Sequence, residues 1–308
     1  MDVQKSTGNF LSSNEVTDIT YYIYEPVGEP VAMLQISHGM CEYLERYEPV
    51  IEFLVGNGYL VFGNDHLGHK NSVLNKSELG YMAYKDGWKC LYKDVITLGR
   101  KMQVAYPSLP LFLFGHSMGS FVARAALVNA PDLFKGVILC GTGGTNSMIG
   151  IGKKVISLVR KLKGDHYRSK MLNNLMFGHY NKRYTEVRTR MDWLSQDKTI
   201  VDNYLGDEYC TFIFTASGFY DLACILQYVS SEEWYERIPQ ELPIYVISGE
   251  MDPVGEWGVG IKEVDQRLKK IELKDYRMKL YPQMRHELLN EVGREEVYKD
   301  ILDWLKEH

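Results

Sequence analysis

The sequence of 308 residues has no long apolar segment and no paired cysteine pattern. Its longest uninterrupted apolar run is five residues, at 222–226, so no segment is predicted to span a membrane. The first 13 residues carry one lysine and no apolar core, so no signal peptide is expected. The five cysteines are scattered, with no Cys-x-x-Cys pair, which favours reduced thiols over a disulfide framework. We therefore expect a cytoplasmic protein.

The chain also lacks a surplus of basic residues. The chain has 35 Lys and Arg against 40 Asp and Glu, a net charge of −5, which argues against a dedicated nucleic-acid-binding protein. No group of His and Cys has the spacing of a zinc site, so we expect neither a metal nor another cofactor. With 45% hydrophobic and 24% charged residues, the composition excludes a disordered chain and indicates an ordinary globular protein.

Strand-like and helix-like segments alternate along most of the chain. Short apolar, β-branched and aromatic segments predict strands, and helix-length segments lie between them. The predicted strands are residues 18–24, 31–37, 59–63, 111–114, 135–140, 243–248 and 276–280, and the predicted helices are 45–56, 88–106, 117–129, 259–270 and 294–306. Because the inner strands are almost entirely apolar, we expect an α/β fold with a mostly parallel central sheet and helices on both faces.

Residues 145–223 interrupt this alternation. The segment is rich in helix formers and methionine, and between residues 152 and 190 eleven Lys or Arg stand against two acidic residues. That stretch therefore carries +9, which leaves −14 for the rest of the chain. We interpret 145–223 as a helical cap inserted between two parts of one core, residues 1–144 and 224–308. Its charge fits a solvated helical face or, alternatively, a surface that meets anionic lipid headgroups or an acidic substrate.

One motif carries a clear chemical prediction. An apolar strand runs directly into Gly115-His116-Ser117-Met118-Gly119 and then into a predicted helix. A serine at the tip of such a tight turn projects above the sheet, and the flanking glycines let strand and helix approach closely. The helix N-terminus behind the serine favours developing negative charge. We therefore predict that Ser117 is a nucleophile.

A serine hydroxyl needs a base and a group that orients the base. In folds with this turn the order along the chain is serine, acid, histidine. The strand at 243–248 ends in a loop with Glu250 and Asp252, and the strand at 276–280 ends in a loop with His286. Both loops leave the carboxyl edge of the sheet, where Ser117 emerges. His286 is the predicted base, and Asp252 is preferred to Glu250 as the acid because of its position after the strand and the proline that follows it.

Acyl transfer also needs backbone N–H groups that stabilise an oxyanion. Met118, directly after the serine, is one predicted donor. Met40 is the other, from the loop that follows the strand at 31–37. His38, at the start of that loop, is expected to brace it by hydrogen bonding rather than to act as a base.

Four motifs occur in a fixed order along the chain: His38-Gly39-x-x-Glu42 with Arg46-Tyr47, Asp65-His66-x-Gly68-His69-x-x-Ser72, Gly115-His116-Ser117-Met118-Gly119, and Arg285-His286-Glu287-Leu288-Leu289-Asn290-Glu291. Together they resemble the monoacylglycerol lipase and lysophospholipase-like family of α/β-hydrolases, also labelled serine aminopeptidase S33. The resemblance implies the α/β-hydrolase fold, a triad of Ser117, Asp252 and His286, and Met40 and Met118 as oxyanion donors. Lys70 and Ser120 stand where the family often has glycine, and neither is part of the implied triad.

The expected function is a serine esterase that cleaves carboxylic esters of lipids with one acyl chain, such as monoacylglycerols or lysophospholipids, through an acyl-enzyme. Its partners would be the lipid-ester substrate and, through the basic cap, a membrane surface. A short-chain carboxylesterase or amide hydrolase with the same triad, and a non-catalytic ligand-binding protein, are the alternatives. Five cap residues are candidates for an apolar acyl pocket, although they would equally suit the cap's own small core: Met171, Leu175, Met176, Phe177 and Trp193.

Overall fold

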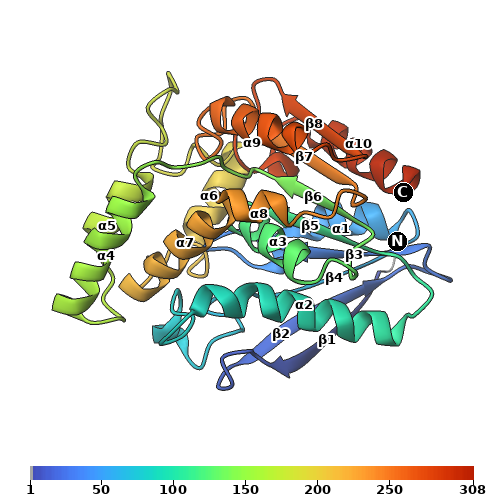
Figure 1. Cartoon of the computed structure of the whole chain (residues 1–308), viewed down its shortest axis with the longest axis horizontal. Helices are drawn as coiled ribbons and strands as arrows, with labels where there is room; N and C mark the ends of the chain where they lie inside the picture. Colours follow the sequence, from blue (N-terminus) through green and yellow to red (C-terminus); the bar gives the residue numbers. More distant parts are fainter. Residues whose placement is uncertain (1–2) are drawn as a thin grey trace.

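The computed structural model describes residues 3–308, and a single eight-stranded sheet forms its centre (Figure 1). The strand order is β1-β2-β4-β3-β5-β6-β7-β8. β1 and β2 pair antiparallel, as do β2 and β4, and the pairs from β4 to β8 are all parallel. The strands are Gln4–Leu11, Asp18–Glu25, Ala32–Ser37, Tyr59–Asn64, Leu111–His116, Gly136–Cys140, Ile244–Gly249 and Tyr276–Tyr281. The predicted mostly parallel sheet is confirmed.

Every residue of the central strands β3 to β7 is buried, because helices cover both faces of a parallel sheet. β1 differs, since it lies at the edge and is largely exposed. Its polar residues give no apolar pattern, so the sequence did not predict this strand. It is held by backbone pairing with β2, for which composition gives no signal.

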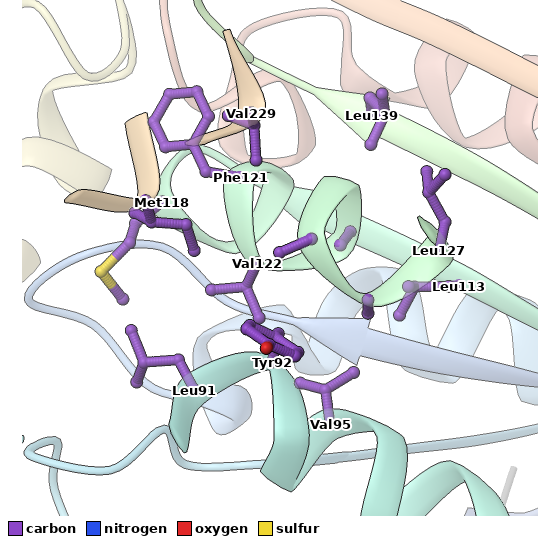
Figure 2. Packing of buried hydrophobic residues seen from close by; sticks show 14 of the residues in the cluster. Leu91, Tyr92, Val95, Leu113, Met118, Phe121, Val122, Leu127, Leu139 and Val229 are labelled. Carbon is purple, nitrogen blue, oxygen red and sulfur yellow. The ribbon is translucent and has the colours of Figure 1, made fainter. Parts of the chain in front are cut away.

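Two helical layers enclose the sheet. α1 (Glu48–Val55) and α10 (Arg294–Glu307) pack in one hydrophobic cluster, while α2 (Gly87–Ala105), α3 (Met118–Asn129) and α9 (Val259–Lys270) pack in the other. Figure 2 shows Val122 of α3 directed toward α2, where Leu91 and Val95 lie. The predicted helix at 45–56 is split into a 3-10 turn, η1 (Leu44–Tyr47), and α1, because the proline at the start of α1 suits a first helical turn and not a helix interior.

The interval between β6 and β7 contains five helices: α4 (Ile149–Lys163), α5 (Lys170–Phe177), α6 (Lys198–Gly206), α7 (Ala216–Val229) and α8 (Glu232–Glu236). α4 and α5 lie at the end of the molecule farthest from the β8 side of the sheet, and α7 lies between them and the sheet (Figure 1). α7 packs against α4 on one side and against α2 and α3 on the other. The predicted end of the insertion, residue 223, lies within α7, so this helix joins the inserted segment to the core.

None of the helices in residues 3–308 combines the length and apolar character that crossing a bilayer requires. Three-residue 3-10 turns, η2 (Lys76–Glu78) and η3 (Leu288–Asn290), complete the regular structure.

Candidate active site

Ser117 stands at the turn between β5 and α3 in a strained backbone conformation, with φ 54° and ψ −122°. The glycines around it have a steric reason. A Cβ on Gly119 would lie 2.0 Å from the Ser37 carbonyl oxygen, and one on Gly115 would lie 2.4 Å from the Gly119 carbonyl oxygen. Ser120 adds a brace, because its hydroxyl donates to the Ser117 carbonyl oxygen at 2.6 Å. The turn therefore holds the serine at the carboxyl edge of the sheet.

Asp252 and His286 meet at the same edge, in the loops after β7 and β8. His286 Nδ1–H donates to Asp252 Oδ2 at 2.9 Å, and the two residues are 2% and 0% exposed. The other oxygen of Asp252 accepts the Val254 N–H at 2.8 Å. Glu250, the competing acid in the sequence, is exposed. Because Nδ1 bonds a carboxylate, the proton resides there and Nε2 is free to act as a base.

Ser117 lies beside this pair. Its N–H donates to the Cys140 carbonyl oxygen at 2.9 Å, and a Cβ on the next residue, Gly141, would lie 3.1 Å from the His286 ring. No hydrogen bond within residues 3–308 joins the Ser117 hydroxyl to His286. Catalytic hydrogen bonds commonly tighten only when substrate is bound.

Both predicted oxyanion donors are available. Met118 is the first residue of α3, so its N–H has no acceptor within the helix. The Met40 N–H donates to no atom of residues 3–308. A Cβ on Gly39 would lie 3.1 Å from the Ser117 Cβ, which places the Met40 loop directly against the serine.

His38 braces that loop. Its Nδ1–H donates to the Gly39 carbonyl oxygen at 2.8 Å, and its Nε2 accepts the His66 N–H at 2.8 Å. Burial lowers the pKa of His38 to about 4, so the ring is neutral. Although His66 and His69 are also buried nearby, no group of His, Cys, Asp or Glu within residues 3–308 is arranged to hold a metal ion.

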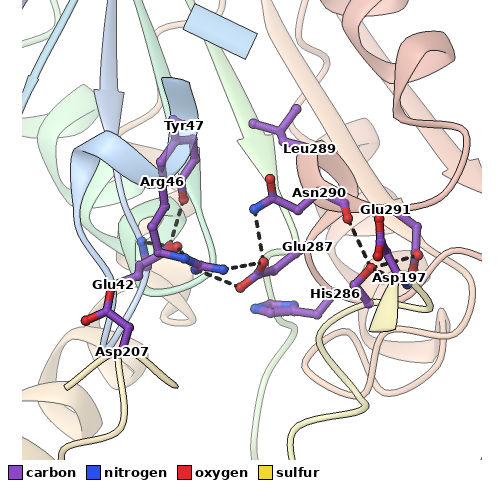
Figure 3. A network of polar contacts seen from close by, with 12 residues as sticks. Glu42, Arg46, Tyr47, Asp197, Asp207, His286, Glu287, Leu289, Asn290 and Glu291 are labelled. Atoms are coloured by element: carbon purple, nitrogen blue, oxygen red, sulfur yellow. Dashed lines mark hydrogen bonds and ion pairs between the residues drawn. The ribbon is translucent and has the colours of Figure 1, made fainter. Parts of the chain in front are cut away.

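A buried ionic network connects the Met40 loop to the His286 loop (Figure 3). Arg46 donates to Glu42 at 2.7 Å and to both carboxylate oxygens of Glu287 at 2.9 and 2.8 Å. Glu42 in turn accepts the Gly39 N–H, and Glu287 directly follows His286. In the sequence, Glu42, Arg46 and Glu287 stood out only as members of the motifs that resemble the family. Their pairing was not predicted because Arg46 and Glu287 are 241 positions apart.

The network fixes the ionisation of its members. Burial alone would raise the pKa of Glu42, but hydrogen bonding to His116 and the charge of Arg46 hold it well below its usual range. Burial alone would lower the pKa of Arg46, but the Glu287 and Glu42 carboxylates raise it above its ordinary value. The Glu42 and Arg46 side chains are therefore charged although little of either is exposed.

Glu291 attaches the inserted segment to the same loop. Its buried carboxylate accepts the Ser195 hydroxyl at 2.9 Å and the N–H groups of Gln196 at 2.7 Å and Arg285 at 2.9 Å. The Leu194 carbonyl oxygen accepts the Glu287 N–H at 2.7 Å. No sequence pattern predicts this attachment. Its consequence is that residues 194–196 help to hold the backbone on both sides of His286.

A series of aromatic rings leads from the inserted segment to His286. The Trp193 ring centroid lies 5.1 Å from that of His286, the Tyr180 ring 4.9 Å from Trp193, and the Phe177 ring 5.5 Å from Tyr180. Two of the predicted pocket residues, Phe177 and Trp193, therefore belong to one aromatic series beside the candidate base. Tyr180, which links them, was not predicted.

The other three predicted pocket residues lie on α5. Met176 is partly buried against the main hydrophobic cluster. Met171 and Leu175 are 57% and 60% exposed and lie on the outer side of the helix. An acyl-binding role for these three stays a prediction.

The parallel sheet, the strained serine at a strand-to-helix turn and the buried Asp–His pair define an α/β-hydrolase. The chain belongs to the family described as serine aminopeptidase, S33, whose model matches residues 28–293. The resemblance drawn from the four motifs is thereby confirmed.

Three known proteins illustrate the similarity. Human monoglyceride lipase is 32% identical over 184 residues, which are 60% of this chain and 54% of that protein. Monoacylglycerol lipase of Mycolicibacterium smegmatis is 24% identical over 292 residues, 94% and 93% of the two chains. The crystal structure of a thermostable carboxyl esterase from Bacillus coagulans has a TM-score of 0.92 at 28% identity, over 99% of each chain. The chain spans only about half of the human enzyme's length.

Proposed function

We propose that this protein is a serine hydrolase that cleaves carboxylic esters of lipids with one acyl chain, and that Ser117, Asp252 and His286 are its catalytic triad. The observation that carries the proposal is the buried hydrogen bond from His286 Nδ1–H to Asp252, next to a serine held in strained backbone geometry. Similarity to proteins named monoglyceride lipase, monoacylglycerol lipase and carboxyl esterase supports the substrate class.

Each step of acyl transfer has a group to perform it. His286 Nε2 takes the proton of Ser117 as its Oγ attacks the ester carbonyl carbon, and Asp252 stabilises the imidazolium that forms. The N–H groups of Met40 and Met118 stabilise the oxyanion. His286 then protonates the leaving alcohol, and water, activated by the same ring, releases the fatty acid from the acyl-enzyme.

The acyl chain needs an apolar surface beside the serine. We propose that Trp193 and Phe177, with Met176 next to Phe177 on α5, provide part of it. A single acyl chain suits this surface, since it is a series of neighbouring side chains and not a broad face.

The test begins with a fluorophosphonate probe, which modifies an activated serine. We expect labelling of the wild type and none of Ser117→Ala. Asp252→Asn should lower kcat by roughly 10⁴-fold with little change in KM, because the histidine then adopts the wrong tautomer. Glu250→Gln, which alters an exposed carboxylate two residues away, is the matched control and should leave kcat unchanged.

A substrate series separates the alternatives. Monoacylglycerols, lysophospholipids, nitrophenyl esters of increasing chain length and a fatty amide should be compared by kcat/KM. Preference for long-chain monoacyl esters supports the proposal. Preference for short esters indicates a carboxylesterase, and preference for the amide indicates an amide hydrolase. A folded wild type that the probe does not label would be a non-catalytic binding protein.

We also propose that the outer face of α4 and α5 contacts membranes, where such substrates reside. Large apolar side chains are exposed there beside exposed lysines, which is the pattern of an interfacial amphipathic helix. The apolar residues are Ile151, Leu158, Leu162, Met171 and Leu175, and the lysines include Lys154, Lys161 and Lys163. The cytoplasmic location expected from the cysteine content stays a prediction.

Vesicle sedimentation tests this contact. Binding to anionic vesicles should weaken as salt rises, because the screening length falls to about 8 Å at 0.15 M. The double variant Leu158→Ser, Leu162→Ser should bind several-fold more weakly. Val27→Ser, which removes an even more exposed apolar side chain on the β2–β3 loop, should bind as the wild type does. Equal binding by both variants would refute the contact.

A further inference from the structure

His116, the residue before the candidate nucleophile, is 4% exposed and takes no part in the proposed chemistry. Both of its ring nitrogens face oxygen atoms. Nε2 lies 3.2 Å from the carbonyl oxygen of His286. Nδ1 lies 3.2 Å from Glu42 Oε1 and 3.0 Å from the Tyr47 hydroxyl oxygen. His116 therefore touches both the loop of the candidate base and the residue that holds the Met40 loop.

Counting protons determines the state of this ring. A carbonyl oxygen only accepts hydrogen bonds, so Nε2 must carry a hydrogen. The Tyr47 hydroxyl donates to Glu42 Oε1 at 2.7 Å, so its proton is already used. An unprotonated Nδ1 would then set its lone pair against two oxygen atoms that offer no hydrogen. If the Tyr47 hydroxyl instead donated to Nδ1, Glu42 Oε1 would lose that donor and would still face the Nδ1 lone pair at 3.2 Å. With a hydrogen on Nδ1, the contacts of Nδ1 with Glu42 and Tyr47 and the contact of Tyr47 with Glu42 are all donor–acceptor pairs.

We propose that His116 is a buried imidazolium cation in the resting protein and acts as a positioning residue that couples the oxyanion loop to the catalytic base. Its Nε2–H holds the backbone of His286. Its Nδ1–H donates to Glu42 Oε1, which also accepts the Gly39 N–H and so holds the loop that carries Met40. The positioning role rests on the function proposed above, whereas the charge assignment does not.

The surrounding charges balance when His116 is a cation. Two carboxylates, Glu42 and Glu287, then face two cations, Arg46 and His116. Burial lowers the pKa of His116, but the hydrogen bond and charge of Glu42, and then the charge of Glu287, raise it above the ordinary value. The other titratable groups around the ring are the Tyr47 hydroxyl, the His286 ring with its partner Asp252, and His38.

His38 provides an internal contrast. It is equally buried and close in space, yet its Nε2 accepts a backbone N–H and only its Nδ1 donates. The same counting therefore makes His38 a neutral ring with one hydrogen. The two histidines differ because the Nε2 of His38 faces a backbone N–H, whereas the Nε2 of His116 faces a carbonyl oxygen and its Nδ1 faces a carboxylate.

Nuclear magnetic resonance of the ¹⁵N-histidine-labelled full chain reads these states directly. At pH 7 we expect two protonated ring nitrogens for His116 and one for His38, assigned by the signals lost in His116→Gln and by the distinct neutral pattern of His38. A single protonated nitrogen on His116 would overturn the charge assignment. The measurement needs no substrate, so it stands whether or not the protein hydrolyses esters.

Kinetics test the positioning role. Gln at 116 has an amide hydrogen for the His286 carbonyl but no charge, so His116→Gln should lower kcat roughly tenfold or more and change KM by less than about twofold. In the wild type kcat/KM should fall at alkaline pH as His116 loses its proton, and this fall should be absent in the variant. His166→Gln, at an exposed histidine, is the control.

A folded His116→Gln, checked by thermal unfolding, with wild-type kcat and an unchanged pH profile would refute positioning. A doubly protonated His116 in a protein that cleaves no ester would refute the proposed function and leave the charge assignment intact.

Discussion

At the scale of single residues, the site depends on where a Cβ atom fits. Ser117 can keep a positive φ because β5 fixes the backbone before it and α3 fixes the backbone after it. Gly119 is equally constrained, since the carbonyl oxygens of Ser37 and His38 lie where its Cβ would be. The spacing of the Gly-x-Ser-x-Gly motif is therefore a consequence of backbone packing.

Gly119→Ala should lower the free energy of unfolding by about 1–3 kcal/mol, because backbone atoms and not a flexible side chain must move. Gly150→Ala is the matched control. Gly150 lies in α4 with nothing within 4 Å of its Cβ position, so alanine should raise the free energy of unfolding by about 0.5–1 kcal/mol. Urea unfolding of the two variants measures both effects, and a Gly119→Ala protein as stable as the wild type would contradict the steric argument.

At the scale of elements, α7 is the helix on which the inserted segment meets the core. Asp221 of α7 is buried at the start of α2, where its Oδ1 accepts the Trp88 N–H at 3.1 Å. Its Oδ2 has no hydrogen-bond partner within residues 3–308. Burial raises the pKa of Asp221 to about 7.

The sign of the resulting pH dependence follows from proton binding. An unfolded aspartate titrates near 3.9, so between about pH 4 and pH 7 only the native protein holds this proton. The stabilisation it gives is complete below pH 4 and is lost as pH rises through about 7. Asp221→Asn should therefore gain stability over the wild type as pH rises, by roughly 1–3 kcal/mol at pH 8 and by little at pH 4.5. Urea unfolding at both pH values measures the difference, which would be the same at each if the carboxyl did not titrate.

Elements also show where sequence patterns fail. The apolar strands were predicted close to their observed limits, because burial on both faces leaves a continuous apolar signal. β1 was missed because an edge strand needs no apolar side chains. The helix at 45–56 was predicted as one element, whereas a proline divides it.

At the scale of the whole molecule, buried polar contacts join parts that are far apart in the sequence. Arg46 and Glu287 bring the first part of the core against the last, and Glu291 attaches the inserted segment. Removing one partner of a buried ion pair leaves a charge without compensation, which costs far more than losing an exposed pair.

Arg46→Met should lower the free energy of unfolding by about 3–5 kcal/mol, because it leaves the buried Glu287 without its cation and removes one of the two cations that face Glu42. Glu287→Gln should cost less, about 1–3 kcal/mol, since Arg46 keeps Glu42. Arg100→Met breaks an exposed pair with Asp132 and should cost less than about 1 kcal/mol. Chemical denaturation ranks the three. Equal costs for Arg46→Met and Arg100→Met would show that the buried network contributes no special stability.

The sequence by itself determined whatever neighbouring residues specify. Apolar runs specified the parallel strands, the glycines around Ser117 specified the turn, and the chain order of strand-end loops singled out Asp252 and His286. Only the tertiary structure decided which distant groups meet: Arg46 with Glu287, Glu291 with Ser195, Trp193 with His286, and the oxygen atoms on both sides of the His116 ring. These pairs leave no periodic pattern in the sequence, because a contact between residues 74 to 241 positions apart depends on how the layers pack and not on the local backbone.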